Sequence, residues 1–170
     1  MRTLGIVGWS GSGKTTLITK LIPLLQTRKL RISTIKHAHA GFAMDTPGKD
    51  SFRHREAGVG EVLVVSGNRW ALLHEAEKEL KLDDLLLRMA EVDIVLVEGM
   101  KEAEISKIEV HRPSLGKPPI WPNQPGILAV ASDEPLTNCD RVVLPLNRPD
   151  RIVSWILRLT GVGITRVSSS

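Results

Sequence analysis

The segment from Gly8 to Thr15, Gly-Trp-Ser-Gly-Ser-Gly-Lys-Thr, carries the clearest chemical signal in the sequence. It fits the pattern G-x-x-x-x-G-K-[ST] at every fixed position, and this pattern is typical of loops that bind nucleotide phosphates. Its glycines let the backbone turn its N–H groups inward around phosphate oxygens. We expect Lys14 to neutralise the β- and γ-phosphates and the Thr15 hydroxyl to bind magnesium. The predicted nucleotide-binding residues of this segment are Gly8, Ser10, Gly11, Ser12, Gly13, Lys14, Thr15 and Thr16.

The residues on either side of this loop are the elements that must position it. Residues 3–7 are mostly apolar and are predicted to form a strand, whereas residues 14–29 place apolar side chains at helical spacing. A strand, a tight loop and a helix in this order are the context that a phosphate loop requires. Pro23 lies inside the expected helix and removes one of its hydrogen bonds, so we expect a kink or an early end there.

A magnesium–nucleotide site also needs a carboxylate, and the apolar segment from Asp93 to Glu98 has an acid at each end. At about 3.3 Å per residue the two acids would lie roughly 16 Å apart. Ligands gather at the carboxyl ends of parallel strands, so Glu98 is the predicted metal ligand. Asp93 is better explained by the connection that leads into this strand.

The segment from Lys36 to Ser51 is expected to open on the same site, because it follows the next predicted strand, residues 31–35. Within it, Asp45 is a candidate magnesium ligand that would act through a water. Lys36 and Lys49 are expected to bind phosphates or an anionic substrate.

Two further sets of residues near this segment have alternative interpretations. Arg53 or Arg55 would bind the same anions from the helix that follows. His37 and His39, together with His54, are the residue type that binds metals, although ordinary polar loop residues are the simpler interpretation.

Recognition of the base has a weaker signal. The N-K-x-D and T-K-x-D strings that are typical of guanine sites are absent from the sequence. Asp133 follows a predicted strand, and its carboxylate could accept hydrogen bonds from the ring N–H and amino group of guanine. An acid that only forms the turn before Pro135 is an equally good interpretation.

The rest of the chain alternates between strand and helix patterns. Strands at 61–65 and 69–73, joined by a turn at 66–68, predict an antiparallel hairpin. Further strands are expected at 92–97, 107–111, 126–131 and 141–146, and helices at 50–57, 81–90 and from Pro149 onward. This order predicts an α/β fold of the P-loop NTPase type, a mainly parallel sheet flanked by helices with a hairpin extension. Residues 1–170 are expected to form one nucleotide-binding domain that contains a proline-rich connector at 113–125.

The composition of the chain argues against several classes of function. The longest apolar runs are far shorter than the ~20 residues of a membrane span, and residues 3–9 lead into the glycine-rich loop without a cleavage signal. These features favour a cytoplasmic protein. The net charge of +4 is spread along the chain, and the sequence has two Phe and no Tyr, so nucleic-acid binding is not favoured. The single Cys139 argues against structural zinc and disulfide chemistry.

Several motifs in one order make the chain resemble the molybdopterin-guanine dinucleotide biosynthesis protein B (MobB) family. The blocks that carry the resemblance are residues 8–16, Lys36-His37, Asp45 with residues 48–51, Arg53 with Ala57-Gly58, and residues 97–101. The resemblance runs over essentially the whole chain. It implies a homodimer that binds GTP, hydrolyses it weakly and assists the enzyme that attaches GMP to molybdopterin. In related dethiobiotin-synthetase-like proteins the strand-end glutamate binds Mg²⁺, which agrees with Glu98.

Two other functions are compatible with the same residues. One is an ATP-dependent transferase or ligase that acts on a small acid held by residues 36–51. The other is a nucleotide-sensing scaffold that needs no turnover. The only glutamines are Gln26 and Gln124, and neither is expected to orient a hydrolytic water, so no catalytic residue is identified.

Overall fold

The computed structural model describes residues 1–38 and 45–163. The chain divides into two compact units, which are described separately. The sheet unit comprises Met1–His37 and the chain from Ala90 onward, and the hairpin unit comprises Ala38–Met89. The expectation of a single nucleotide-binding domain over residues 1–170 stays a prediction.

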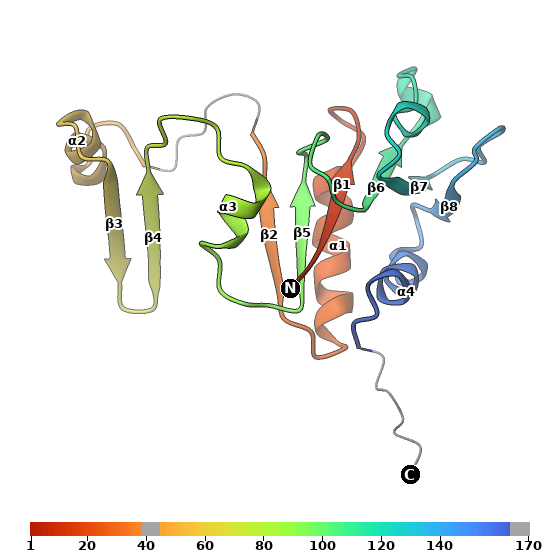
Figure 1. The fold of residues 1–170 in the computed structure, drawn as a ribbon, viewed down its shortest axis with the longest axis horizontal. Coiled ribbons are helices and arrows are strands. Elements are labelled where there is room, and N and C mark those ends of the chain that lie inside the picture. Colours follow the sequence, from red (N-terminus) through yellow and green to blue (C-terminus); the bar gives the residue numbers. More distant parts are fainter. Residues whose placement is uncertain (39–44, 164–170) are drawn as a thin grey trace, which may run out of the picture. The chain divides into compact units, whose positions relative to one another are not determined.

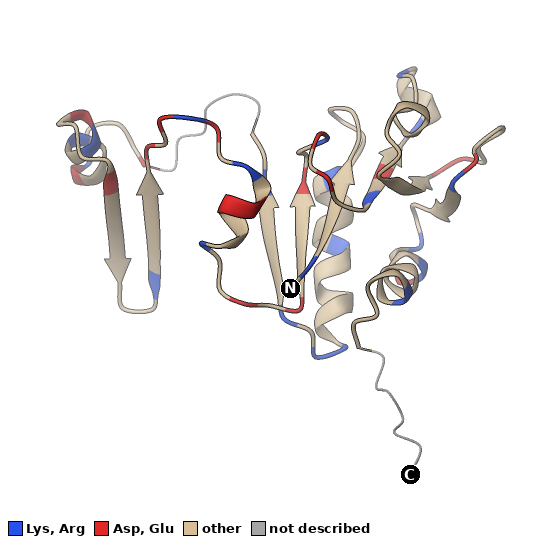
Figure 2. Ribbon diagram, viewed as in Figure 1, with Lys and Arg blue, Asp and Glu red and all other residues tan. Residues whose placement is uncertain are grey.

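A six-stranded parallel sheet forms the centre of the sheet unit, with the strand order β2-β5-β1-β6-β7-β8 (Figure 1). Its strands are β1 (Arg2–Val7), β2 (Ile32–Lys36), β5 (Ile94–Glu98), β6 (Lys107–His111), β7 (Ile127–Ser132) and β8 (Val142–Pro145). In the register, Glu98 lies opposite Ile6 on one side and Lys36 on the other. Their carboxyl ends therefore lie at one edge of the sheet. In Figure 2, β5 ends at this edge in red, the colour of acidic residues, and β2 ends in blue, the colour of basic residues.

Two helices pack against one face of this sheet, α1 (Lys14–Gln26) and α4 (Pro149–Thr160). Alternate apolar residues of the strands meet the apolar stripes of the helices in one buried core, to which Leu4, Ile6, Leu21, Leu96 and Ile152 all belong. Each of these five side chains is fully buried. The core fixes the start of α1 directly beneath the carboxyl edge of β1.

The helix α1 continues to Gln26, three residues beyond Pro23, so the proline does not end it where it stands. A proline removes one hydrogen bond of the helical ladder, here the bond to the Thr19 carbonyl. The buried side chains of Leu21 and Leu25 lie on either side of Pro23 and pack into the core. Their packing holds the last turn of the helix in place.

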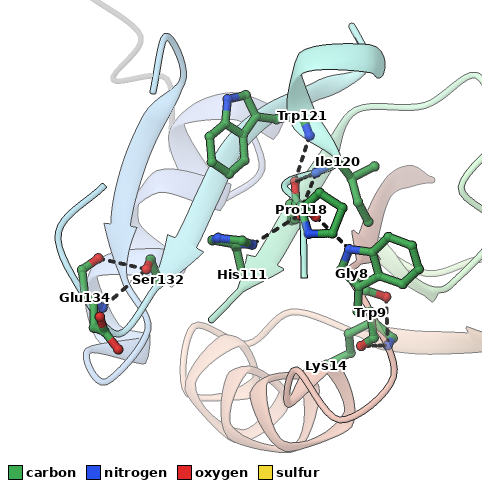
Figure 3. Close-up of polar contacts among 10 residues, drawn as sticks. Gly8, Trp9, Lys14, His111, Pro118, Ile120, Trp121, Ser132 and Glu134 are labelled. Carbon is green, nitrogen blue, oxygen red and sulfur yellow. Dashed lines mark hydrogen bonds and ion pairs between the residues drawn. The ribbon is translucent and has the colours of Figure 1, made fainter. Parts of the chain in front are cut away.

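The opposite face of the sheet is packed by the proline-rich connector, which contains the short 3-10 helices η1 (Pro113–Leu115) and η2 (Trp121–Asn123). Trp121 is buried with Val7, Ile127 and Val130 in a second apolar cluster. The fully buried carboxylate of Glu109 on β6 accepts backbone hydrogen bonds from Ile120 and from Trp121, at 3.0 and 2.8 Å (Figure 3). Glu109 therefore ties the connector to the sheet.

The hairpin unit contains α2 (Asp50–Glu56), β3 (Glu61–Ser66), β4 (Arg69–His74) and α3 (Leu82–Leu86). The strands β3 and β4 pair antiparallel, with Val65 opposite Trp70, which confirms the predicted hairpin. The predicted helix at 81–90 is wrong in length, because α3 ends at Leu86. Beyond it, the N–H of Arg88 and that of Met89 each bond to the carbonyl three residues earlier, so the chain tightens into turns.

In the part of the chain that the structure describes, none of the helices is both long and apolar enough to cross a membrane.

The burial of Glu109 predicts a pH-dependent contribution to stability. Burial raises the pKa of its carboxyl group, against the opposing effects of the Ile120 and Trp121 N–H groups, His111 and Lys101. The folded protein then binds this proton more tightly than the unfolded chain does. We expect the free energy of unfolding, relative to Glu109→Gln, to fall as the pH rises above about 4.3, the ordinary glutamate value. Urea unfolding of both proteins across this pH range measures the difference. A stability difference that grows with pH would contradict the raised pKa.

Candidate functional site

The loop between β1 and α1 has the backbone conformation that its glycines allow. Gly8 and Gly13 have φ angles of 147° and 98°, and Gly13 is the N-cap residue that precedes α1. A Cβ atom added at Gly8 would lie 2.5 Å from the carbonyl oxygen of Val110, so a larger residue would clash with backbone. The predicted phosphate loop therefore adopts the tight turn into a helix N-terminus that its sequence indicates.

A hollow of about 410 Å³ opens at this loop. The residues that line it are Ser10, Gly11, Gly13, Lys14, Thr15, Thr16, Lys36 and Glu98. They come from the loop, from the first turn of α1 and from the carboxyl ends of β2 and β5. All of them are residues for which the sequence predicts a role in binding nucleotide or metal, and the structure brings them together.

Thr15 and Glu98 contact each other in the lining of this hollow. The Thr15 hydroxyl donates a 2.7 Å hydrogen bond to Oε1 of Glu98, and the Lys36 ammonium lies 3.9 Å from the same oxygen. Glu98 reaches Thr15 because β5 and β1 are neighbours in register and end at the same edge. A hydroxyl and a carboxylate are both oxygen ligands of the kind that Mg²⁺ prefers, so the residues present fit this ion.

The Lys14 ammonium lies over the loop and donates hydrogen bonds to the carbonyl oxygens of Gly8 and Trp9, at 3.1 and 2.9 Å. Burial lowers the pKa of Lys14, and the positive charges of Lys101 and Lys36 lower it further, against the opposing charge of Glu98. Bringing these like charges together is unfavourable without an anion between them. The site is therefore electrostatically prepared for a polyanion.

Asp93 lies at the amino end of β5, far from this hollow. Its Oδ2 accepts a 2.7 Å hydrogen bond from the backbone N–H of Arg31, the residue before β2. The structural role that the sequence predicts for Asp93 is thus confirmed.

Asp45 and Lys49 belong to the hairpin unit, and their predicted roles in binding metal and anions stay predictions. The Asp45 carboxylate accepts hydrogen bonds from Nε and Nη2 of Arg55, at 2.9 and 3.0 Å, and Arg55 also pairs with Glu75. Arg55 is therefore engaged inside the hairpin unit.

The alternative histidine site has no support in the described residues. His39 lies outside them, and His37 and His54 belong to different units. Within residues 1–38 and 45–163, no group of three or more His, Cys, Asp and Glu side chains is arranged to hold a metal.

Asp133 does not line the hollow, but it is connected to the phosphate loop through Arg112. The Arg112 guanidinium forms an ion pair with Asp133, and its Nε donates a 2.9 Å hydrogen bond to the Ser12 carbonyl. Asp133 directly follows β7, and Arg112 directly follows β6. The pair braces the loop, and sequence reasoning missed Arg112. The one feature of the sequence that pointed to Arg112 was its position at the carboxyl end of a strand. Recognition of guanine by Asp133 stays a prediction.

Sequence reasoning also missed Trp9 and Lys101. The Trp9 indole N–H donates a 2.7 Å hydrogen bond to the Pro118 carbonyl, and the Lys101 ammonium lies 4.6 Å from the centre of the Trp9 ring. Figure 3 shows Trp9 between Pro118 and Lys14. The side chain of a loop residue thus joins the connector to the phosphate site.

Comparison with known proteins gives concordant results. Residues 3–133 match the family described as "Molybdopterin guanine dinucleotide synthesis protein B". The chain is 44% identical over 155 residues to the "Molybdopterin-guanine dinucleotide biosynthesis adapter protein" of Haemophilus influenzae, covering 90% of this chain and 86% of the relative. It is 42% identical over 167 residues to the protein of the same name from Escherichia coli K12, covering 93% and 95%.

Solved structures agree with this assignment. A structure described as "molybdopterin-guanine biosynthesis protein B (mobB)" superposes with a TM-score of 0.75 at 30% identity, covering 94% of this chain and 99% of the other. The MobB homologue from Bacillus stearothermophilus superposes with a TM-score of 0.71 at 24% identity, covering 95% and 99%, and so supports the fold. The predicted α/β fold and the predicted family are both confirmed, and the chain belongs to the molybdopterin guanine dinucleotide synthesis protein B family.

Proposed function

We propose that this protein is a GTP-binding adapter in molybdopterin-guanine dinucleotide biosynthesis. Its relatives in two bacteria are named as adapters of this biosynthesis. The observation that carries the nucleotide part of the proposal is the Thr15–Glu98 hydrogen bond in a hollow that Lys14 and Lys36 also line. A phosphate loop, a hydroxyl, a carboxylate and two ammonium groups are the parts that a magnesium–nucleotide site needs.

Each residue of the hollow has a distinct task in this proposal. The backbone N–H groups of the loop and the start of α1 bind phosphate oxygens. Lys14 leaves the Gly8 and Trp9 carbonyls and neutralises the β- and γ-phosphates. Thr15 and Glu98 would hold Mg²⁺, which would supply positive charge to the phosphate oxygens when bound.

Hydrolysis in this site is expected to be slow. An efficient GTPase needs a side chain that orients the attacking water, often a glutamine. Gln26 is the last residue of α1, and the Gln124 amide faces Glu102 at 3.5 Å. Neither lines the hollow. GTP would therefore be bound well and turned over weakly, as suits an adapter.

The partners in the proposal follow from the same chemistry. An adapter of this biosynthesis would work in the cytoplasm beside the guanylyltransferase that makes the dinucleotide. Molybdopterin and its guanine dinucleotide carry phosphate, and Lys36, which lines the hollow, is the residue we propose for that second anion. The proposal involves neither nucleic acid nor a membrane.

The hairpin unit supports the proposal of a homodimer. Leu63, Val65, Trp70 and Leu72 on β3 and β4 are 61%, 71%, 68% and 49% exposed. A cluster of exposed apolar side chains on a short two-stranded sheet is typical of an interaction surface. We propose a second copy of the chain as the occupant.

The preference for GTP is tested by calorimetric titration of GTP and ATP with magnesium. We expect tighter binding of GTP, and a loss of at least about tenfold in Lys14→Ala, because a charge-assisted contact to phosphate is lost. Lys20→Ala, which removes an exposed lysine of the same helix, is the matched control and should bind like the wild type. A preference for ATP would instead favour a transferase or ligase of the dethiobiotin-synthetase type.

The role of Glu98 is tested by Glu98→Gln, which keeps the size of the side chain and removes its charge. Magnesium-dependent GTP affinity should fall by about tenfold or more, while binding measured with a chelator present changes little. An equal loss in both conditions would show that Glu98 only supports the structure.

The dimer is tested by Trp70→Glu, which places a charge on the exposed apolar cluster of the hairpin. Light scattering should show a dimer for the wild type and a shift toward monomer for the variant, because burying an unpaired carboxylate is costly. Leu87→Glu changes a residue that is 85% exposed outside the hairpin and should leave the dimer intact. A monomeric wild type would refute the proposal.

A further inference from the structure

Trp9 makes contacts with three separate parts of the sheet unit. Its backbone carbonyl accepts a hydrogen bond from Lys14, its indole N–H donates to Pro118, and its ring lies 4.6 Å from the Lys101 ammonium. The Lys117 ammonium lies farther from the same ring, at 5.9 Å. One side chain of the phosphate loop thus positions ammonium groups from distant parts of the sequence.

The Trp9 ring is held in place by a buried anchor. Pro118 lies in the connector just before Ile120 and Trp121, whose backbone N–H groups bond to the buried Glu109 carboxylate (Figure 3). Because Glu109 fixes the connector to β6, the Pro118 carbonyl is a fixed acceptor for the indole N–H. A ring fixed in this way can hold a cation at a defined place.

Lys101 is directed to this place by the chain that follows Glu98. Gly99 and Met100 have φ angles of 88° and 48°, and a left-handed conformation at a methionine is unusual. These two residues turn the chain sharply at the edge of the site. The Lys101 ammonium lies 4.6 Å from the ring of Trp9, a residue of the phosphate loop, and its charge contributes to lowering the pKa of Lys14.

The printed contact of the Lys101 ammonium is the Trp9 ring, and its charge also acts on the buried Glu109 carboxylate. A cation–π contact at a partly exposed site is weaker than a hydrogen bond between an ammonium and a phosphate oxygen. An anion that arrives beside Trp9 would therefore draw Lys101 from the ring to itself.

We propose that Lys101 binds a phosphoryl group that lies next to those bound by the phosphate loop. When this group is absent, the Trp9 ring holds the Lys101 ammonium beside the loop. The inference rests on the proposed function, because it assumes that the loop binds phosphates. The phosphoryl group has two sources: the terminal phosphate of a nucleoside triphosphate, or the phosphate of a second ligand bound beside a diphosphate. Lys101 is the binding residue, and Trp9 is its positioning residue.

The experiment compares phosphate chains of different length on the full-length protein with magnesium. Tripolyphosphate, pyrophosphate, GTP and GDP are titrated calorimetrically into the wild type and into Lys101→Met. Inorganic phosphate is also titrated into each protein saturated with GDP. Lys20→Met, which removes one exposed charge elsewhere, is the matched control, and Lys101→Arg restores the charge.

We expect Lys101→Met to weaken the binding of tripolyphosphate and GTP by about tenfold, and that of pyrophosphate and GDP less than about twofold. Lys101→Arg should recover most of the loss, and Lys20→Met should show none. A loss confined to inorganic phosphate in the GDP-saturated protein would assign the group to a second ligand. An equal loss for all chains, or no loss, would overturn the proposal.

The inorganic probes separate this inference from the proposed function. If guanine nucleotides bind no better than adenine nucleotides but the selective loss for tripolyphosphate remains, the proposed function fails and the role of Lys101 stands. If GTP binding is confirmed and Lys101→Met affects GTP and GDP alike, the role of Lys101 fails and the proposed function stands.

Trp9→Phe tests the positioning step. It keeps an aromatic ring but removes the N–H that bonds to Pro118, so we expect a selective loss for tripolyphosphate that is smaller than the loss in Lys101→Met. The fluorescence of Trp9 is the part of the tryptophan emission that is lost in Trp9→Phe. This fluorescence should change when tripolyphosphate binds the wild type, and it should stay constant in Lys101→Met. A Trp9 emission that responds equally in both proteins would show that Lys101 does not leave the ring.

Discussion

The hydrogen bond between Thr15 and Glu98 depends on one constraint, the parallel pairing of β1 with β5. In this pairing Glu98 lies opposite Ile6, so β5 ends where the phosphate loop begins. A shift of one residue in the register would turn the Glu98 side chain to the other face of the sheet. The buried strand residues on both sides of this pair exclude such a shift. The apolar core therefore sets the position of Glu98, the only carboxylate among the described residues that line the hollow.

Positive charge predominates around the Glu98 carboxylate. The charges of Lys101 and Lys36 lower the pKa of Lys14, and the charge of Glu98 opposes them. Burial adds to the cost of keeping Lys14 charged. A site of this kind sacrifices some stability of the empty protein for affinity toward an anion. Its backbone supports are correspondingly strong: Arg112 holds the Ser12 carbonyl, and Pro118 holds the Trp9 indole.

The sequence predicts the parts of this site whose position follows from a local pattern. The phosphate loop is contiguous, and the choice of Glu98 over Asp93 needs only the direction of a parallel strand. The hairpin is likewise local, since its turn and its strands are adjacent. Arg112 and Trp9 could not be found in this way, because each bonds to a backbone carbonyl about a hundred residues away, and a carbonyl has no sequence signature.

The ends of two helices depend on packing that a local pattern does not contain. The helix α1 continues past Pro23 to Gln26, because the packing of Leu21 and Leu25 outweighs one missing hydrogen bond. The helix at α3 is shorter than its apolar stripe suggests, and Leu87, one residue beyond its end, is exposed. Packing in three dimensions, which a periodic pattern does not contain, decides both helix ends.

A crystal structure of the protein with Mg²⁺ and a non-hydrolysable GTP analogue tests the central claim most directly. We expect the phosphates inside the loop, the ion bound by the Thr15 hydroxyl with Glu98 beside it, and Lys14 moved from the Gly8 and Trp9 carbonyls onto the phosphates. The same map would show what Asp45 and Asp133 contact. A nucleotide bound elsewhere, with Lys14 still on the loop carbonyls and the Thr15–Glu98 bond unchanged, would show that this loop is not the nucleotide site.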